Sequence, residues 1–129
     1  MATSKTTINS PLYTTKFTDT DASSGSSASK VEVSTSALNV GEIFIDNSVK
    51  ASKMYLKLYN AANTGAVTVG TTDPHLILTV EASSTVKYTF VPNMVFSSGC
   101  TYSLVTTAGT AGTTGANVAG IKVEILVGS

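Results

Sequence analysis

The chain has 129 residues, which suits one ordinary domain with a single hydrophobic core. Only 12% of the residues are charged, and eight lysines balance eight carboxylates without any arginine. A nucleic-acid-binding protein needs clustered Lys or Arg to neutralise phosphates, so these singly scattered lysines exclude nucleic acid as an expected partner.

The surface implied by this composition is covered with hydroxyl groups. The chain contains 17 Ser and 21 Thr beside 42% apolar residues, and Thr favours β-strands. A net charge of zero gives little protection against association. We therefore expect a β-rich protein that works inside an assembly.

Membranes and disulfide chemistry are not expected either. The longest apolar run is far below the roughly 18 to 20 residues that span a bilayer. The N-terminal "MATSKTTINSPLYTTKF" lacks the apolar segment of a secretory signal, which predicts a soluble protein made in a cytoplasm. Cys100 is the single cysteine, so we expect a buried thiol in a strand rather than a disulfide or a multi-cysteine metal site.

Residues 1–29 are predicted to form a flexible N-terminal arm. They are rich in Ser, Thr and Asp, and "ASSGSSASK" is typical of a Gly/Ser linker. One short strand fits within "LYTTKFT", and the arm is expected to be mobile alone or ordered by a neighbour. "TDTDASSG" lacks the closing Glu of a calcium loop, so it is interpreted as linker.

Residues 30–129 are predicted to form one β-sandwich domain. Apolar residues recur there at every second position, the spacing that directs side chains to one face of a strand. The alternating sets are Val31 and Val33; Ile43 and Ile45; Met54, Leu56 and Leu58; Leu76, Leu78 and Val80; Val86, Tyr88 and Phe90; Tyr102 and Leu104; and Ile121, Val123, Ile125 and Val127.

Turn signals separate these segments at intervals of about 8 to 12 residues. The turns are "AANTG", "GTTDP", "EASST", "FSSG" and "AGTAGTTGAN", and no segment has a helical period with caps. The fold predicted is all-β: an antiparallel β-sandwich, jelly-roll-like, of seven or eight strands. A closed eight-stranded barrel is the alternative, because the pattern does not show which strands pair.

The single histidine lies in "TTDPHLILTV", two residues after Asp73 and directly after Pro74. Proline lacks an amide hydrogen and keeps Asp73 out of the helical region, so this stretch ends a loop before a strand. Catalysis by His75 would need a nucleophile and an orienting carboxylate, and no "GxSxG" motif is present. We interpret Asp73 and His75 as the turn, and a small hydrolase using Ser or His75 as a rival hypothesis.

Other candidate sites are weaker. "TAGTAGTTGANVAG" lacks the "GK[ST]" ending of a phosphate loop, and one His with one Cys cannot make a zinc site. Tyr55, Tyr59, Tyr88 and Tyr102 could stack on a sugar, but alternating tyrosines in strands are usually packing residues. No catalytic residue, metal ligand or cofactor is predicted, and we expect a protein that is not an enzyme.

The segment "VPNMVFSSG" contains Met94, Val95 and Phe96 between Pro92 and Gly99. If it is a loop, it exposes an apolar patch of the kind that marks contact surfaces. If it is a strand, these residues belong to the core. The pattern leaves both alternatives open.

The succession "YLKLYN", "VGTTDPHLILTVEASSTVKYTFV", "PNMVFSSGCTYSLVTTAGTAG" resembles segments of small virion structural proteins of tailed bacteriophages. The likeness covers roughly residues 53–116 and consists of strands and turns rather than a catalytic motif. The resemblance implies a non-enzymatic component similar in size to head decoration (cement) proteins, which often form trimers on the capsid exterior. It implies no functional residue.

These observations lead to one functional hypothesis with an alternative. We expect a decoration protein on the capsid exterior that binds the major capsid protein and itself, as a trimer, after synthesis in the host cytoplasm. The predicted interface residues are Leu12, Tyr13 and Phe17 in the arm, with Met94 and Phe96. Removing residues 1–29 should then leave a folded core. The alternative is a tail or fibre component whose β-sandwich binds a glycan.

Overall fold

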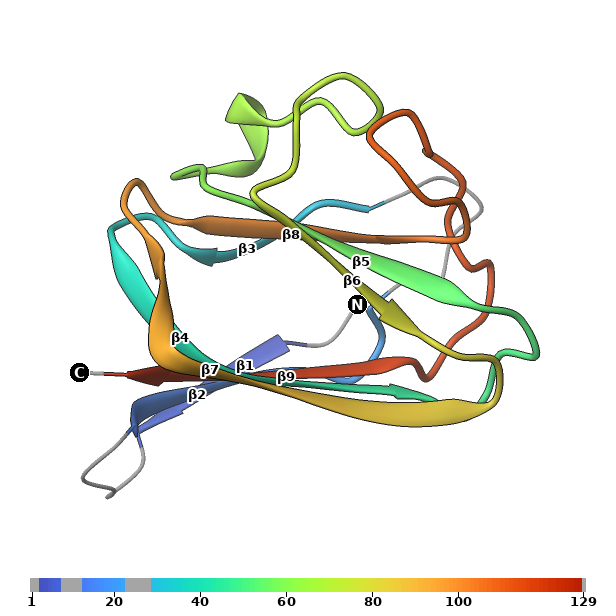
Figure 1. The fold of residues 1–129 in the computed structure, drawn as a ribbon, viewed down its shortest axis with the longest axis horizontal. Coiled ribbons are helices and arrows are strands. Elements are labelled where there is room, and N and C mark those ends of the chain that lie inside the picture. Colours follow the sequence, from blue (N-terminus) through green and yellow to red (C-terminus); the bar gives the residue numbers. More distant parts are fainter. Residues whose placement is uncertain (1–2, 8–12, 23–28, 129) are drawn as a thin grey trace.

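The computed structural model describes residues 3–7, 13–22 and 29–128, and this part of the chain forms a β-sandwich (Figure 1). Nine strands make up two antiparallel sheets of five and four strands. The all-β class and the antiparallel sandwich are thereby confirmed. The alternative of one closed barrel is wrong, because each sheet ends in edge strands.

The strand order brings distant parts of the chain together. The five-stranded sheet has the order β1 (Thr3–Thr7), β2 (Tyr13–Asp19), β9 (Lys122–Gly128), β4 (Leu38–Asn47) and β7 (Ser84–Phe96). The four-stranded sheet has the order β3 (Val31–Ser34), β8 (Cys100–Val105), β5 (Met54–Tyr59) and β6 (Leu76–Val80). One 3₁₀-helix, η1 (Thr64–Ala66), lies in the loop between β5 and β6.

The core lies between the sheets and uses the alternating residues. Ile43 and Ile45 on β4 are completely buried, as are Leu56 and Leu58 on β5 and Leu104 on β8. Burying each such side chain contributes about 1.5–3 kcal/mol. A shift of register by one residue would turn these side chains outward, so the core fixes the pairing.

The start of the described chain belongs to the sandwich. β2 pairs with β9 on one side and β1 on the other, which confirms the short strand expected in "LYTTKFT". Phe17 is only 2% exposed, and its ring meets that of Tyr102 edge-on with centroids 6.0 Å apart. The Tyr102 hydroxyl donates to Asp19 Oδ2 over 2.5 Å, joining the two sheets. Among the strands of the described ranges, only β1 is exposed along its whole length.

β7 is an edge strand with a pronounced bulge. Thr89 pairs with Glu42 and Met94 with Val40, so residues 90–93 face only Gly41 on β4. A Cβ atom on Gly41 would lie 2.1 Å from Cε1 of Tyr13, so the close approach of that ring requires glycine. The unpaired residues of the bulge bend β7 out of the regular ladder.

Candidate functional site

The segment from Asp73 to His75 closes the β5–β6 loop before β6 begins. The backbone N–H of His75 donates to Leu58 O over 2.7 Å, and Asp73 Oδ1 accepts from Thr110 Oγ1 at 3.3 Å. His75 Nε2 lies 3.1 Å from Val95 O, and its ring lies 4.9 Å from that of Phe96. The backbone and ring of His75 and one carboxylate oxygen of Asp73 thus have structural partners, in agreement with the interpretation as a turn.

Groups that could support reaction chemistry are few in the described ranges. Among those residues, no three His, Cys, Asp or Glu side chains come together to hold a metal ion. Cys100 is buried as expected, and burial raises the pKa of its thiol to about 12. A thiol with that pKa is not a nucleophile at neutral pH, because only the thiolate attacks.

An apolar patch stands out on the free edge of β7. Val91 is 90% exposed and Val95 is 57% exposed, with exposed Pro92 between them. We call Val91, Pro92 and Val95 the β7 edge patch. The bulge leaves Val91 and Pro92 without a pairing partner on β4, whereas Val95 pairs with Asn39 and faces outward. Exposed apolar clusters of this kind mark contact surfaces.

The residues predicted from the sequence to form the interface do not belong to this patch. The structure makes "VPNMVF" the end of a strand, so Phe96 is completely buried and Met94 packs against the core. Phe17 is also a core residue, so neither phenylalanine presents a surface to a partner in this structure. Tyr13 is half-buried beside Gly41, and Leu12 lies outside the described residues.

The alternation itself contained a signal for the β7 edge patch. Tyr88 and Phe90 face the core, so the next residue, Val91, should face outward. Pro92 then interrupts the ladder, since it has no amide hydrogen to donate. Val95 could not be placed in this way, because its direction depends on the size of the bulge.

The outer face of the five-stranded sheet carries a second surface feature, a groove of about 350 Å³ containing Phe44 and Leu126. Ion pairs flank these side chains: Lys16 Nζ lies 2.6 Å from Glu124 Oε2, and Lys87 Nζ lies 3.2 Å from Glu42 Oε1. Although partial burial opposes it, hydrogen bonding from Lys16 and Lys122 lowers the pKa of Glu124. These charges satisfy one another, so the groove does not select a partner by charge.

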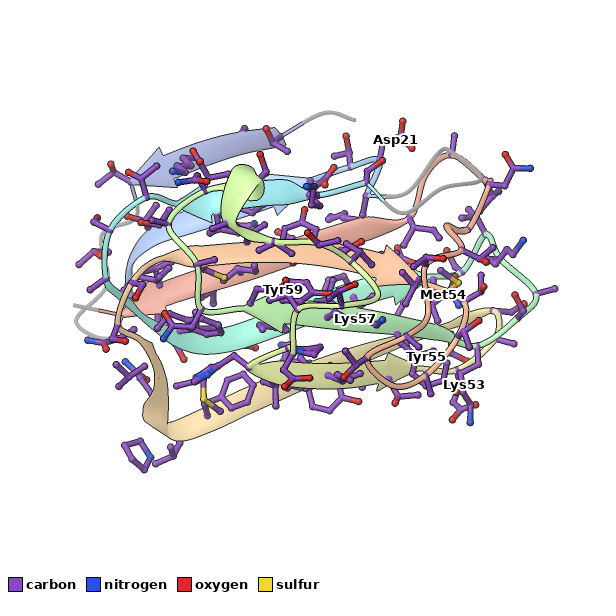
Figure 2. All side chains as sticks on the ribbon, turned by 90° about the horizontal axis from the view of Figure 1, so that it is seen from above. Asp21, Lys53, Met54, Tyr55, Lys57 and Tyr59 are labelled. Carbon is purple, nitrogen blue, oxygen red and sulfur yellow. The ribbon has the colours of Figure 1, made fainter. Side chains whose placement is uncertain are left out.

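Lys57 is the unexpected polar residue of the four-stranded sheet. Tyr55, Lys57 and Tyr59 project from the outer side of β5, where the alternating pattern predicts exposure (Figure 2). Instead Lys57 is completely buried, and its Nζ donates to Thr110 O at 3.0 Å and Gly112 O at 2.6 Å. Desolvation lowers its pKa.

The carbonyls that accept from Lys57 belong to the loop between β8 and β9, which lies over the outer side of the four-stranded sheet (Figure 1). The hydroxyls of Tyr59 on β5 and Ser103 on β8 are also buried without a hydrogen-bond partner among the described residues. A substrate has no access to Lys57 in this arrangement, so we assign it a structural role. No pattern in the sequence indicates the position of this loop.

Comparison of the chain with protein-family models, with curated proteins and with solved structures gave no match. The resemblance to phage virion proteins therefore stays a prediction from the sequence. In the described ranges, no helix is long and apolar enough to cross a membrane.

Proposed function

We propose that this protein is a non-enzymatic structural component of a tailed-bacteriophage virion. In this proposal it is a decoration (cement) protein that binds the major capsid protein on the capsid exterior and stabilises the head. It is made in the host cytoplasm and acts as a homo-oligomer, a trimer. Neither a nucleic acid nor a membrane is a partner.

The observation that carries the proposal is the β7 edge patch. The patch places two exposed valines and a proline on a surface otherwise dominated by hydroxyl groups and internally paired charges. Burying apolar area of this kind contributes roughly 25 cal/mol per Å². A neutral protein without long-range charge steering can bind a neutral partner surface through such a patch.

The order of the strands supports the jelly-roll form of this proposal. From β2 to β9, the chain places β2, β4, β7 and β9 in one sheet and β3, β5, β6 and β8 in the other. The orders β2-β9-β4-β7 and β3-β8-β5-β6 are the arrangement expected of two interlocked Greek keys. Jelly rolls occur in viral capsid and lectin domains, so fold alone does not decide between a head and a tail role.

Oligomerisation would strengthen a contact of this small size. Three copies on a repeating lattice bind through several patches at once, so avidity replaces the affinity of a single contact. β1 belongs to the predicted N-terminal arm and is exposed along its whole length, which supports a role for it in contacting a neighbour.

The experiment is a binding assay on capsids that lack this protein, with bound copies counted by quantitative mass spectrometry. We expect on the order of hundreds of copies per particle for the wild type, because every lattice position offers a site. Val91→Asp should reduce binding at least about tenfold, since it puts a charge into an apolar contact. Its side chain is exposed, so the fold should be unaffected.

The matched control is Val49→Asp, which adds the same charge at a valine that is 49% exposed, in the turn after β4. This variant should bind like the wild type. Equal binding by Val91→Asp and the wild type would remove the β7 edge patch from the proposal. A few copies per virion, confined to the tail, would contradict the decoration role.

A further inference from the structure

The loops at one end of the four-stranded sheet enclose a depression of about 460 Å³. The loop between β5 and β6 supplies most of its lining, including Ala61, Ala66, Asp73 and Pro74, and the turn between β7 and β8 adds Ser98. A connection of this length is unusual in a compact domain, and long loops at the end of a sandwich often bind ligands.

The depression is formed in advance, because side chains tie its loops together. Asn60 Nδ2 donates to Ser97 Oγ at 2.9 Å, and Asn60 Oδ1 accepts from Ser98 N at 2.8 Å. Gly99 has a φ of +142°, and a Cβ there would lie 2.6 Å from Ser34 O, so the turn packs closely against the sandwich. A preformed site avoids the entropic cost of ordering loops when a ligand binds.

Asp73 and His75 provide hydrogen-bond acceptors in the lining of the depression. Val95 O can only accept, so in the neutral imidazole the hydrogen bond at 3.1 Å places the ring proton on His75 Nε2 and leaves Nδ1 as an acceptor. Asp73 uses Oδ1 for Thr110, and no described group bonds to its Oδ2. Thr72 Oγ1 accepts from Thr68 N, so its hydroxyl hydrogen remains available to donate.

The charge and the apolar lining restrict the class of ligand. Asp73 is the only residue with a formal charge in the lining, and its carboxylate disfavours phosphates and other anions. Three alanines and Pro74 supply small apolar surfaces beside the acceptors. A pyranose ring matches both features, because it carries adjacent hydroxyl donors and a C–H face. A lone exposed carboxylate attracts a simple cation only weakly.

We propose that this depression binds a neutral pyranose unit of a saccharide. Asp73 and His75 accept hydrogen bonds from its hydroxyl groups, and the alanine and proline side chains contact its C–H face. Of the four tyrosines considered from the sequence as a sugar platform, only Tyr59 lines this depression, and it is buried. The inference does not rest on the decoration role.

The test is an NMR titration of the full chain with glucose, galactose, mannose and N-acetylglucosamine. Each sugar is titrated into the wild type and into the variant Asp73→Ala. At least one sugar should give saturable shifts at the amides of residues 60–75 and 97–99, with the millimolar affinity typical of one small ligand. Asp73→Ala should weaken that binding about tenfold, the effect of losing a charge-assisted hydrogen bond.

Two controls make the result decisive. Glu32→Ala removes an exposed carboxylate on β3 outside the depression and should leave sugar binding unchanged. Butylamine, an organic cation, tests whether the Asp73 carboxylate binds cations instead of sugars. Shifts with butylamine but with none of the sugars, or no saturable shift with any sugar, would overturn the proposal. Capsid attachment of Asp73→Ala should equal that of the wild type, so failure here is separable from failure of the decoration role.

Discussion

At the scale of single residues, the contact between Asp19 and Tyr102 joins the first strand of the core to the opposite sheet. Both residues are completely buried, and the Tyr102 hydroxyl donates to the Asp19 carboxylate. Asp19 Oδ1 also accepts from the backbone N–H of Asp21 at 3.0 Å, so both carboxylate oxygens are satisfied. These hydrogen bonds compensate for the desolvation of the pair. Removing one partner would leave the other buried without a hydrogen bond, which lowers the stability of the fold.

This contact predicts a loss of stability at alkaline pH. Burial, and next the Asp19 charge, raise the pKa of Tyr102 above its ordinary value near 10. Above about pH 10 the unfolded chain releases this proton while the folded chain keeps it, so the free energy of unfolding falls by up to about 1.4 kcal/mol per pH unit. Urea unfolding followed between pH 8 and pH 11 measures the slope.

The variant Tyr102→Phe isolates the contribution of this residue. It should reduce the alkaline slope, while lowering stability at neutral pH by about 1–3 kcal/mol because Asp19 loses its donor. Tyr88→Phe is the matched control, since the Tyr88 hydroxyl donates only to a backbone carbonyl, Thr79 O, at a partly buried position. The same loss at neutral pH in both variants would contradict the special role of the Asp19 contact.

At the scale of elements, Lys57 fastens the loop between β8 and β9 to the four-stranded sheet. Its ammonium group is held by two carbonyls of that loop, and no described carboxylate forms an ion pair with it. The positive charge is therefore kept in place by dipoles of the loop, which makes the loop position depend on Lys57.

We predict that Lys57→Met releases this loop while the sandwich stays folded. Hydrogen exchange of residues 106–114, read by mass spectrometry, should accelerate at least about tenfold, because charge-assisted hydrogen bonds are lost. The midpoint of global unfolding should move much less, since an apolar side chain of similar length also removes a buried charge. Lys53→Met, at an exposed lysine on the surface, should leave exchange as in the wild type. Unchanged exchange in Lys57→Met would show that other contacts hold the loop.

The elements of this fold differ in how well the sequence predicts them. The strands around Ile43, Leu56 and Leu104 follow from local alternation, because one buried face is enough to define them. The bulge in β7 does not follow, because it lies in the pairing of β7 with β4, a strand far away in the sequence. The burial of Lys57 is also non-local, since the loop that covers it begins about 50 residues later. The candidate surfaces arise at such non-local features.

At the scale of the whole molecule, the structure changes what the N-terminal segment is expected to do. The composition of residues 1–29 predicted an arm separable from a folded core. In the structure, β2 lies between β1 and β9, and Phe17, Asp19 and Ala22 are buried. The strand itself was expected, but the low apolar content of the segment concealed its place in the core, because a few well-placed side chains are sufficient to bury it. β1 is the exception, since its five residues are all exposed.

Two truncations distinguish these parts of the segment. Removal of residues 1–7 should leave the thermal unfolding midpoint, measured by circular dichroism, near that of the wild type, because β1 buries no side chain. Removal of residues 1–22 should unfold the protein or shift the midpoint strongly downward. It deletes Phe17, a loss comparable to the roughly 3–5 kcal/mol of a buried Phe→Ala change, and it leaves the Tyr102 hydroxyl without its partner. If the longer truncation kept the stability of the wild type, the N-terminal segment would be a separable arm after all. If the shorter truncation lost stability, β1 would contribute contacts beyond its pairing with β2.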